Sequence, residues 1–188
     1  MNKLGYDLNC IRLPEGVEPE MIQTIINLES SGGGFDSKTG KIKIQFEPHQ
    51  FKKRVNKPTG VWDKNKVDVQ SKEWEAFNDA FKIDPNAAME STSIGLVQIM
   101  GFHWKRLGFN SVGEMWDFFK ISEQNQVLGL VKFIETDQSL LKAFINKDWH
   151  NIARLYNGAN YVELAKKLGK EPYNVLLEKQ YKKLKGVK

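Results

Sequence analysis

The chain contains a single cysteine, Cys10, among its 188 residues. One cysteine cannot form an intramolecular disulfide, and it says nothing firm about the redox compartment. The chain also lacks an uninterrupted apolar run of membrane-spanning length. Its opening residues, MNKLGYDLNCIRLPEG, lack the apolar segment and the small-residue cleavage pattern of a secretory signal peptide. We therefore expect synthesis in a cytoplasm, so that a target outside it would require another means of delivery.

Several chemical motifs are also missing. The three histidines, His49, His103 and His150, are far apart and show no spacing typical of metal ligands, so we expect no metal site. The glycine run GGGF precedes a strand-like segment rather than a helix, which argues against a phosphate-binding or dinucleotide-binding loop. Cys10 has no evident base beside it and is a poor candidate nucleophile. These absences predict chemistry without a metal or cofactor.

The composition is that of a folded protein, with 40% hydrophobic and 27% charged residues. The length suits one domain, and we expect a single domain over residues 1–188, since no repeat or long linker interrupts the chain. The net charge of +5 favours an anionic partner such as nucleic acid, a membrane surface or a bacterial wall polymer. Because the positive charge is spread along the chain rather than clustered, we do not expect nucleic-acid binding.

The hydrophobic pattern predicts a mainly α-helical α+β domain. Pro19 opens a helix-like apolar pattern that runs to Leu28 and Glu29, and residues 41–47 alternate as a strand does, after a turn at residues 35–40. The remainder reads as helical. We expect helices over 72–83, 85–90, 95–100, 102–107, 112–119, 123–136, 138–146, 149–156, 160–168 and 171–185. Asp148 marks the start of the helix over 149–156.

Two glutamates are candidates for acid catalysis. Glu29 ends an apolar helix and precedes SSGGGF, where the negative helix end and the apolar neighbours Leu28 and Phe35 would raise its pKa. Glu47 follows the strand, eighteen residues later. Cleavage of a glycosidic bond commonly uses two such carboxyl groups. A solvated glutamate at a helix end is nevertheless the commoner case, and the glycines could form a turn or allow close approach of a substrate.

Two further segments combine polar and apolar residues. In STSIGLVQIMG (91–101), Gln98 lies within an apolar turn, where its amide either bonds to nearby backbone groups or points into a groove. In RLYNGANY (154–161), Asn157 and Gly158 favour a turn that would leave Tyr156 at a helix end. Trp62, Phe102 and Trp104 are candidates for stacking on a sugar ring. Each of these features alone has an ordinary structural explanation.

Taken in order, ESSGG, FEPHQF, STSIGLVQIMGF and RLYNGANY resemble the bacteriophage-type N-acetylmuramidase (endolysin) family of lysozyme-like fold. The resemblance implies Glu29 as catalytic acid, Glu47 as second acidic residue and Tyr156 as an assisting side chain. His103 stands where a smaller polar residue is expected, so no role is carried over to it. The resemblance also implies that His49, Ser93, Gln98 and Asn157 line the glycan groove or support the catalytic pair. We expect Phe102 and Tyr161 to bind the substrate as well.

This resemblance implies a peptidoglycan hydrolase that cleaves the β-1,4 bond between N-acetylmuramic acid and N-acetylglucosamine. We expect a monomer without a separate wall-binding module, made in a host cytoplasm and released to the wall through a holin-like pore or a secretion system. A lytic transglycosylase giving 1,6-anhydro products and a non-catalytic peptidoglycan-binding protein remain open. The basic C-terminal segment (171–185) is read as a packed helix with a solvated lysine face, and weak contact with an outer membrane or anionic lipid is the alternative.

Overall fold

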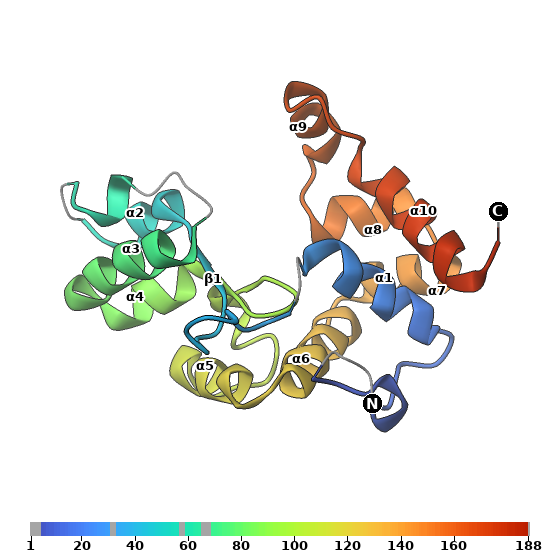
Figure 1. Ribbon diagram of the computed structural model, residues 1–188, viewed down its shortest axis with the longest axis horizontal. Coiled ribbons are helices and arrows are strands. Elements are labelled where there is room, and N and C mark those ends of the chain that lie inside the picture. Colours follow the sequence, from blue (N-terminus) through green and yellow to red (C-terminus); the bar gives the residue numbers. More distant parts are fainter. Residues whose placement is uncertain (1–4, 31–32, 57–58, 65–68, 188) are drawn as a thin grey trace. The chain divides into compact units, whose positions relative to one another are not determined.

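The computed structural model describes residues 5–30, 33–56, 59–64 and 69–187. This part of the chain is mainly helical and contains one small antiparallel sheet, which confirms the predicted α+β class (Figure 1). The helices are α1 (Pro19–Glu29), α2 (Pro48–Arg54), α3 (Gln70–Ile83), α4 (Pro85–Glu90), α5 (Val112–Ile121), α6 (Glu123–Glu135), α7 (Gln138–Asn146), α8 (Trp149–Tyr156), α9 (Tyr161–Lys167) and α10 (Tyr173–Lys185). Short 3-10 helices are η1 (Leu8–Cys10), η2 (Trp62–Lys64) and η3 (Gly101–His103).

The contacts divide the chain into two compact units. The first unit comprises Met1–Tyr6 and Gly32–Gly129, and the second comprises Asp7–Ser31 and Leu130–Lys188. The chain leaves the first unit within α6, so the N-terminal helix α1 belongs to the same unit as the C-terminal helices. Each unit is described by itself below.

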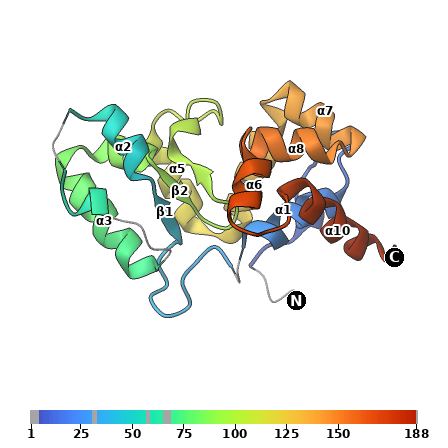
Figure 2. The same cartoon turned by 90° about the horizontal axis from the view of Figure 1, so that it is seen from above.

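The first unit is built on a three-stranded antiparallel sheet in the order β1 (Ile44–Phe46), β2 (Thr92–Ile94) and β3 (Ile99–Met100). Figure 2 shows β1 beside β2, where Ile44 pairs with Ile94. Ile44 and Phe46 are buried and Gln45 between them is exposed, as the alternating sequence predicts. An isolated bridge between Phe35 and Ile42 closes the predicted turn before this strand.

The helices predicted over 95–100 and 102–107 are wrong. Residues 92–100 form the β2–β3 hairpin, and residues 101–108 form the 3-10 helix η3 and turns. Gly95 has φ +77° and Gln98 has φ +50°, left-handed values that end a right-handed helix. Pairing of β2 with β1 supplies backbone partners from a distant segment. The local apolar pattern could not reveal that pairing.

Trp62 cannot stack on a sugar, because its side chain is fully buried. Its ring packs edge-on against Phe51, with centroids 4.9 Å apart, and Phe51 in turn contacts Phe46 of β1. Through Phe51, this aromatic cluster joins α2 to β1 and anchors the segment that follows Glu47. The role of Trp62 is therefore in the core of the first unit.

Packing within the first unit explains part of the glycine run. Gly33 has φ +112°, which confirms a turn that favours glycine. A Cβ at Gly34 would lie 2.0 Å from Oε1 of Gln126. The absence of a side chain at Gly34 therefore leaves room for Gln126 of the same protein. Gln126 is fully buried, accepts from the Leu96 N–H at 2.6 Å and donates to the Phe119 carbonyl at 3.0 Å.

Replacement of this buried amide is expected to destabilise the fold. Gln126→Leu would leave the Leu96 N–H and the Phe119 carbonyl without their partner, at a cost of about 3 kcal/mol in the free energy of unfolding. The same substitution at the exposed Gln138 is the control and should change stability by less than about 0.5 kcal/mol. Urea denaturation followed by circular dichroism measures both. Equal effects would contradict a bridging role for Gln126.

The second unit packs α1 against α10, and α8 against α7 and α10 (Figure 1). Pro19 occupies the first turn of α1, and the helix ends at Glu29, as predicted. Its buried face consists of Met21, Ile22, Thr24, Ile25 and Ile26. This face explains why the short helix is stable: burial of its apolar side chains holds it on the unit's core.

The basic helix α10 is packed rather than free. Leu177 and Tyr181 are buried, and Lys182 and Lys185 form ion pairs with Glu178 at 2.9 Å and Glu18 at 3.3 Å. These contacts agree with the packed-helix interpretation, and lipid contact stays a prediction. Among the described residues, no helix has the length and apolar character required to cross a membrane.

Candidate functional site

Glu29 is a carboxyl group of the second unit whose pKa is raised by burial. It is partly buried at the end of α1, and the hydroxyl of Tyr173 donates a hydrogen bond to its Oε1. Burial raises the pKa of Glu29 above its ordinary value, and the Tyr173 hydrogen bond opposes this rise by stabilising the carboxylate. The raised pKa favours a protonated group at higher pH than an exposed glutamate would allow. This is the property that a general acid requires.

Tyr156 lies beside this pair. Its ring is parallel to that of Tyr173, with centroids 6.5 Å apart and an interplanar angle of 3°. Phe133 of α6 meets the Tyr156 ring edge-on at 5.7 Å. Burial and the nearby charge of Glu29 raise the pKa of the Tyr156 hydroxyl well above its ordinary value. Side chains from four helices, α1, α6, α8 and α10, thus form one array around Glu29.

Sequence reasoning missed Tyr173. It is the first residue of α10, 144 positions after Glu29, and follows Pro172 in a segment that reads as an ordinary helix start. The predicted helix over 171–185 includes it without distinguishing its side chain. Only the packing of α10 on α1 brings its hydroxyl to the carboxyl group. We find no signal in the sequence that could have identified it.

Glu47 occupies the N-cap of α2, directly after β1 in the first unit. Gln45 donates to its Oε1 at 3.2 Å, and Nδ1 of His49 lies 3.3 Å from its Oε2. Burial raises the pKa of Glu47, and the neighbouring His49 opposes the rise. Its side chain is 28% exposed, so the carboxyl group stays accessible. The predicted residues Glu47 and His49 therefore form a contact pair.

Ser93 and Gln98 form a second contact pair in the first unit. The hydroxyl of Ser93 donates to Oε1 of Gln98 at 2.7 Å, and Nε2 of Gln98 donates to the Gly95 carbonyl at 2.8 Å. The amide therefore bonds to a backbone group of its own turn, which is the first of the two alternatives that the sequence left open. These bonds stabilise the β2–β3 hairpin, and Ser93 also pairs with Gln45, two residues before Glu47.

Three other predicted residues differ in accessibility. Phe102 is 36% exposed, and the Arg54 guanidinium lies 5.4 Å from its ring centroid. Asn157 is exposed at the C-cap of α8. Tyr161 is buried and its hydroxyl is hydrogen-bonded to Nδ1 of His150 at 2.7 Å. Tyr161 thus has a packing role, and substrate contact by any of the three stays a prediction.

The predicted site residues fall into two groups, one in each unit. The second unit brings Glu29 and Tyr156 together and adds Tyr173. The first unit holds five further candidates near β1 and the β2–β3 hairpin: Glu47, His49, Ser93, Gln98 and Phe102. The last two candidates, Asn157 and Tyr161, lie in the second unit. Among the described residues, no group of three histidine, cysteine or acidic side chains is placed to hold a metal ion.

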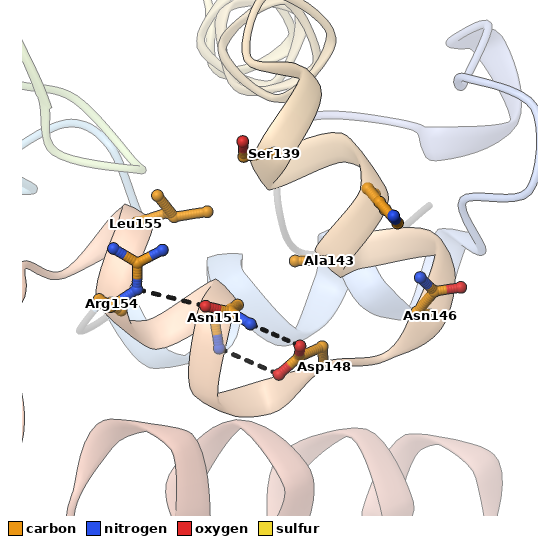
Figure 3. A pocket seen from close by; sticks show the side chains of 8 residues that line it. Ser139, Ala143, Asn146, Asp148, Asn151, Arg154 and Leu155 are labelled. Carbon is orange, nitrogen blue, oxygen red and sulfur yellow. Dashed lines mark hydrogen bonds between the residues drawn. The ribbon is translucent and has the colours of Figure 1, made fainter.

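A polar pocket of about 380 Å³ lies between α7 and α8 (Figure 3). The predicted site residues all lie in the described ranges, and none of them lines this pocket. Figure 3 shows Asn151 between Asp148 and Arg154: its Nδ2 donates to Asp148 at 2.6 Å and its Oδ1 accepts from Arg154 at 3.2 Å. Asp148 also accepts from the Asn151 backbone N–H at 3.1 Å, so it caps α8 as the sequence predicts.

Two comparisons with known proteins identify relatives of this chain. A family model described as Muramidase, N-acetylmuramidase, matches residues 18–185. The crystal structure of Burkholderia AP3 phage endolysin is similar, with a TM-score of 0.71 and 32% sequence identity. The match covers 89% of this chain and 64% of that chain, so this chain spans less than two thirds of the endolysin. No curated protein matches the chain.

Proposed function

Because this chain belongs to the N-acetylmuramidase family, we propose that it hydrolyses peptidoglycan at the β-1,4 bond between N-acetylmuramic acid and N-acetylglucosamine. The observation that carries the proposal is the carboxyl group of Glu29, partly buried with a raised pKa and held by a tyrosine hydroxyl. A raised pKa makes the protonated form of this group available at higher pH than in an exposed glutamate. Leaving-group protonation is the first requirement of glycosidic cleavage.

In the proposed reaction, Glu29 donates a proton to the glycosidic oxygen as positive charge develops at the anomeric carbon. Glu47 acts in its ionised form, either by activating water or by stabilising that charge. His49 supports this form, because its ring beside Oε2 of Glu47 lowers the pKa of Glu47 and so opposes the effect of burial. Tyr156 assists by its position beside the Glu29 and Tyr173 pair. These residues require no metal or cofactor for the chemistry described.

Three of the remaining predicted residues are proposed to contact the glycan strand. Phe102 offers a partly exposed ring, and Asn157 offers an exposed amide at the end of α8. His49 is also exposed, whereas Ser93 and Gln98 are proposed to support the backbone that lines the substrate path. The proposed substrate places the site of action at the bacterial wall. Release through a holin-like pore or secretion system belongs to the same proposal.

The reaction products test this proposal directly. Purified peptidoglycan is digested with the enzyme, and the soluble fragments are resolved by mass spectrometry. We expect reducing N-acetylmuramic acid ends, because water completes the hydrolysis. Anhydro-muramic ends would instead identify a lytic transglycosylase, and binding to sacculi without release of fragments would identify a peptidoglycan-binding protein.

A further inference from the structure

We propose that Tyr173 is a positioning residue for Glu29: it holds one carboxyl oxygen and leaves the other to protonate the glycosidic bond. The proposal rests on the proposed role of Glu29 as catalytic acid. It concerns a residue that neither the motif resemblance nor the sequence pattern singled out. Its basis is the hydrogen bond from the Tyr173 hydroxyl to Oε1 of Glu29.

The placement of Tyr173 follows from how α10 lies on α1. The hydroxyl of Tyr173, at the start of α10, donates to Glu29 at the end of α1. The hydroxyl of Tyr181, eight residues further along α10, donates to Glu18 at the start of α1 at 2.6 Å. The two helices therefore run in opposite directions and are joined by a tyrosine–glutamate bond at each end. The hydrogen bond between Tyr181 and Glu18 lies among lysines at the surface. The hydrogen bond between Tyr173 and Glu29 is shielded from water, because Glu29 is desolvated by burial.

The Tyr173 ring is held by its neighbours. The parallel Tyr156 ring lies on one side, and Phe133 supports Tyr156 edge-on. A tyrosine side chain has few rotatable bonds, so contacts of this kind set the direction of its hydroxyl. The aromatic array thereby holds the Tyr173 hydroxyl in place as a donor to one oxygen of Glu29. Tyr156 contributes by supporting Tyr173.

The protonation states of Tyr173 and Glu29 decide which of the two groups donates the hydrogen bond. The titratable groups that the structure places against Glu29 are Tyr173 on α10 and Tyr156 on α8. Burial and the charge of Glu29 raise the pKa of Tyr173 well above its ordinary value, so its hydroxyl keeps its proton at neutral pH and remains a donor. A protonated carboxyl group has one accepting oxygen and one hydroxyl oxygen. Because Oε1 accepts from Tyr173, the acidic proton resides on Oε2.

The same bond serves both states of the acid. Before the reaction it directs the proton to Oε2, which passes it to the glycosidic oxygen as the bond to the anomeric carbon breaks. After the transfer, Oε1 of the new carboxylate still accepts from Tyr173, and bonds to charged groups are the stronger ones. Tyr173 therefore lowers the cost of giving up the proton and moderates the rise in pKa that burial causes.

Tyr173→Phe tests the proposal, because it removes the hydroxyl and keeps the ring. We expect kcat on solubilised peptidoglycan to fall about tenfold with little change in KM, since the donor acts on the acid rather than on substrate binding. The basic limb of the kcat/KM profile should move to higher pH by about one unit, because loss of the donor raises the pKa of Glu29. Tyr181→Phe is the matched control on the same helix and should leave the profile unmoved.

A second variant avoids any effect of the lost hydroxyl on folding. Incorporation of 3-fluorotyrosine at position 173 retains the ring and makes the hydroxyl a stronger donor, so the basic limb should move to lower pH. Opposite shifts in the two variants would support the proposal. An unmoved limb in the fluorinated enzyme, or an equal shift in Tyr181→Phe, would overturn it. Retention of activity by Glu29→Gln would instead contradict the proposed catalyst, which separates the two failures.

Discussion

Glu29→Gln is expected to lower kcat for release of reducing ends from peptidoglycan by about 10²–10⁴-fold. An amide has the size of the carboxyl group and retains an oxygen that can accept from Tyr173, so the fold should be kept. It has no acidic proton to donate to the leaving oxygen. Glu20→Gln on the same helix is the control, because Glu20 is half-buried and pairs with Lys185 at the surface. Near-wild-type activity of Glu29→Gln would rule out its role as the acid.

The pH dependence of the wild-type enzyme follows from the same group. A general acid must be protonated, so activity is present below the pKa of Glu29 and is lost as the pH rises through it. Since burial raises that pKa, we expect the basic limb of the profile to lie above the range of an exposed glutamate. A reducing-end assay across pH locates this limb, which provides the reference for the Tyr173 variants.

Glu47→Gln is expected to cause the second large loss, about 10²-fold in kcat, because the proposed second carboxylate would be neutral. The substitution keeps side-chain size and an oxygen that can accept from Gln45 at 3.2 Å. Glu75→Gln is the control in the first unit, since Glu75 is exposed and pairs with the exposed Lys72 at 2.7 Å. Mass spectrometry of the products completes the test. Activity of Glu47→Gln with anhydro-muramic ends would favour transglycosylation, which can proceed without a second acid.

Local sequence patterns predicted much of the fold. Pro19 and the apolar spacing after it marked α1 and its end at Glu29, and alternation around residues 41–47 marked β1. Asp148 correctly indicated the start of α8, because a cap bonds to backbone groups only a few positions away. The lysozyme-like, mainly helical class is also confirmed. These features are readable in sequence because they depend on neighbouring residues.

The β2–β3 hairpin shows where local reasoning failed. Residues 95–100 have the apolar character of a helix turn, yet Gly95 and Gln98 adopt left-handed backbone values. Strand β2 gains its partner from residues 44–46, almost fifty positions earlier. The fully buried Gln126 then bonds to Leu96 from α6. Contacts from distant segments outweighed the local preference for a helix.

By itself, the sequence determined the helical class, the helix that ends at Glu29 and the ordered motifs that identify the family. Tertiary structure alone decided which groups act on that carboxyl group. Tyr173 reaches Glu29 across 144 positions because α10 packs on α1, and the parallel Tyr156 ring fixes the direction of its hydroxyl. The physical reason is that helix formation depends on local spacing, whereas the pKa and orientation of a buried acid depend on whichever distant side chains surround it.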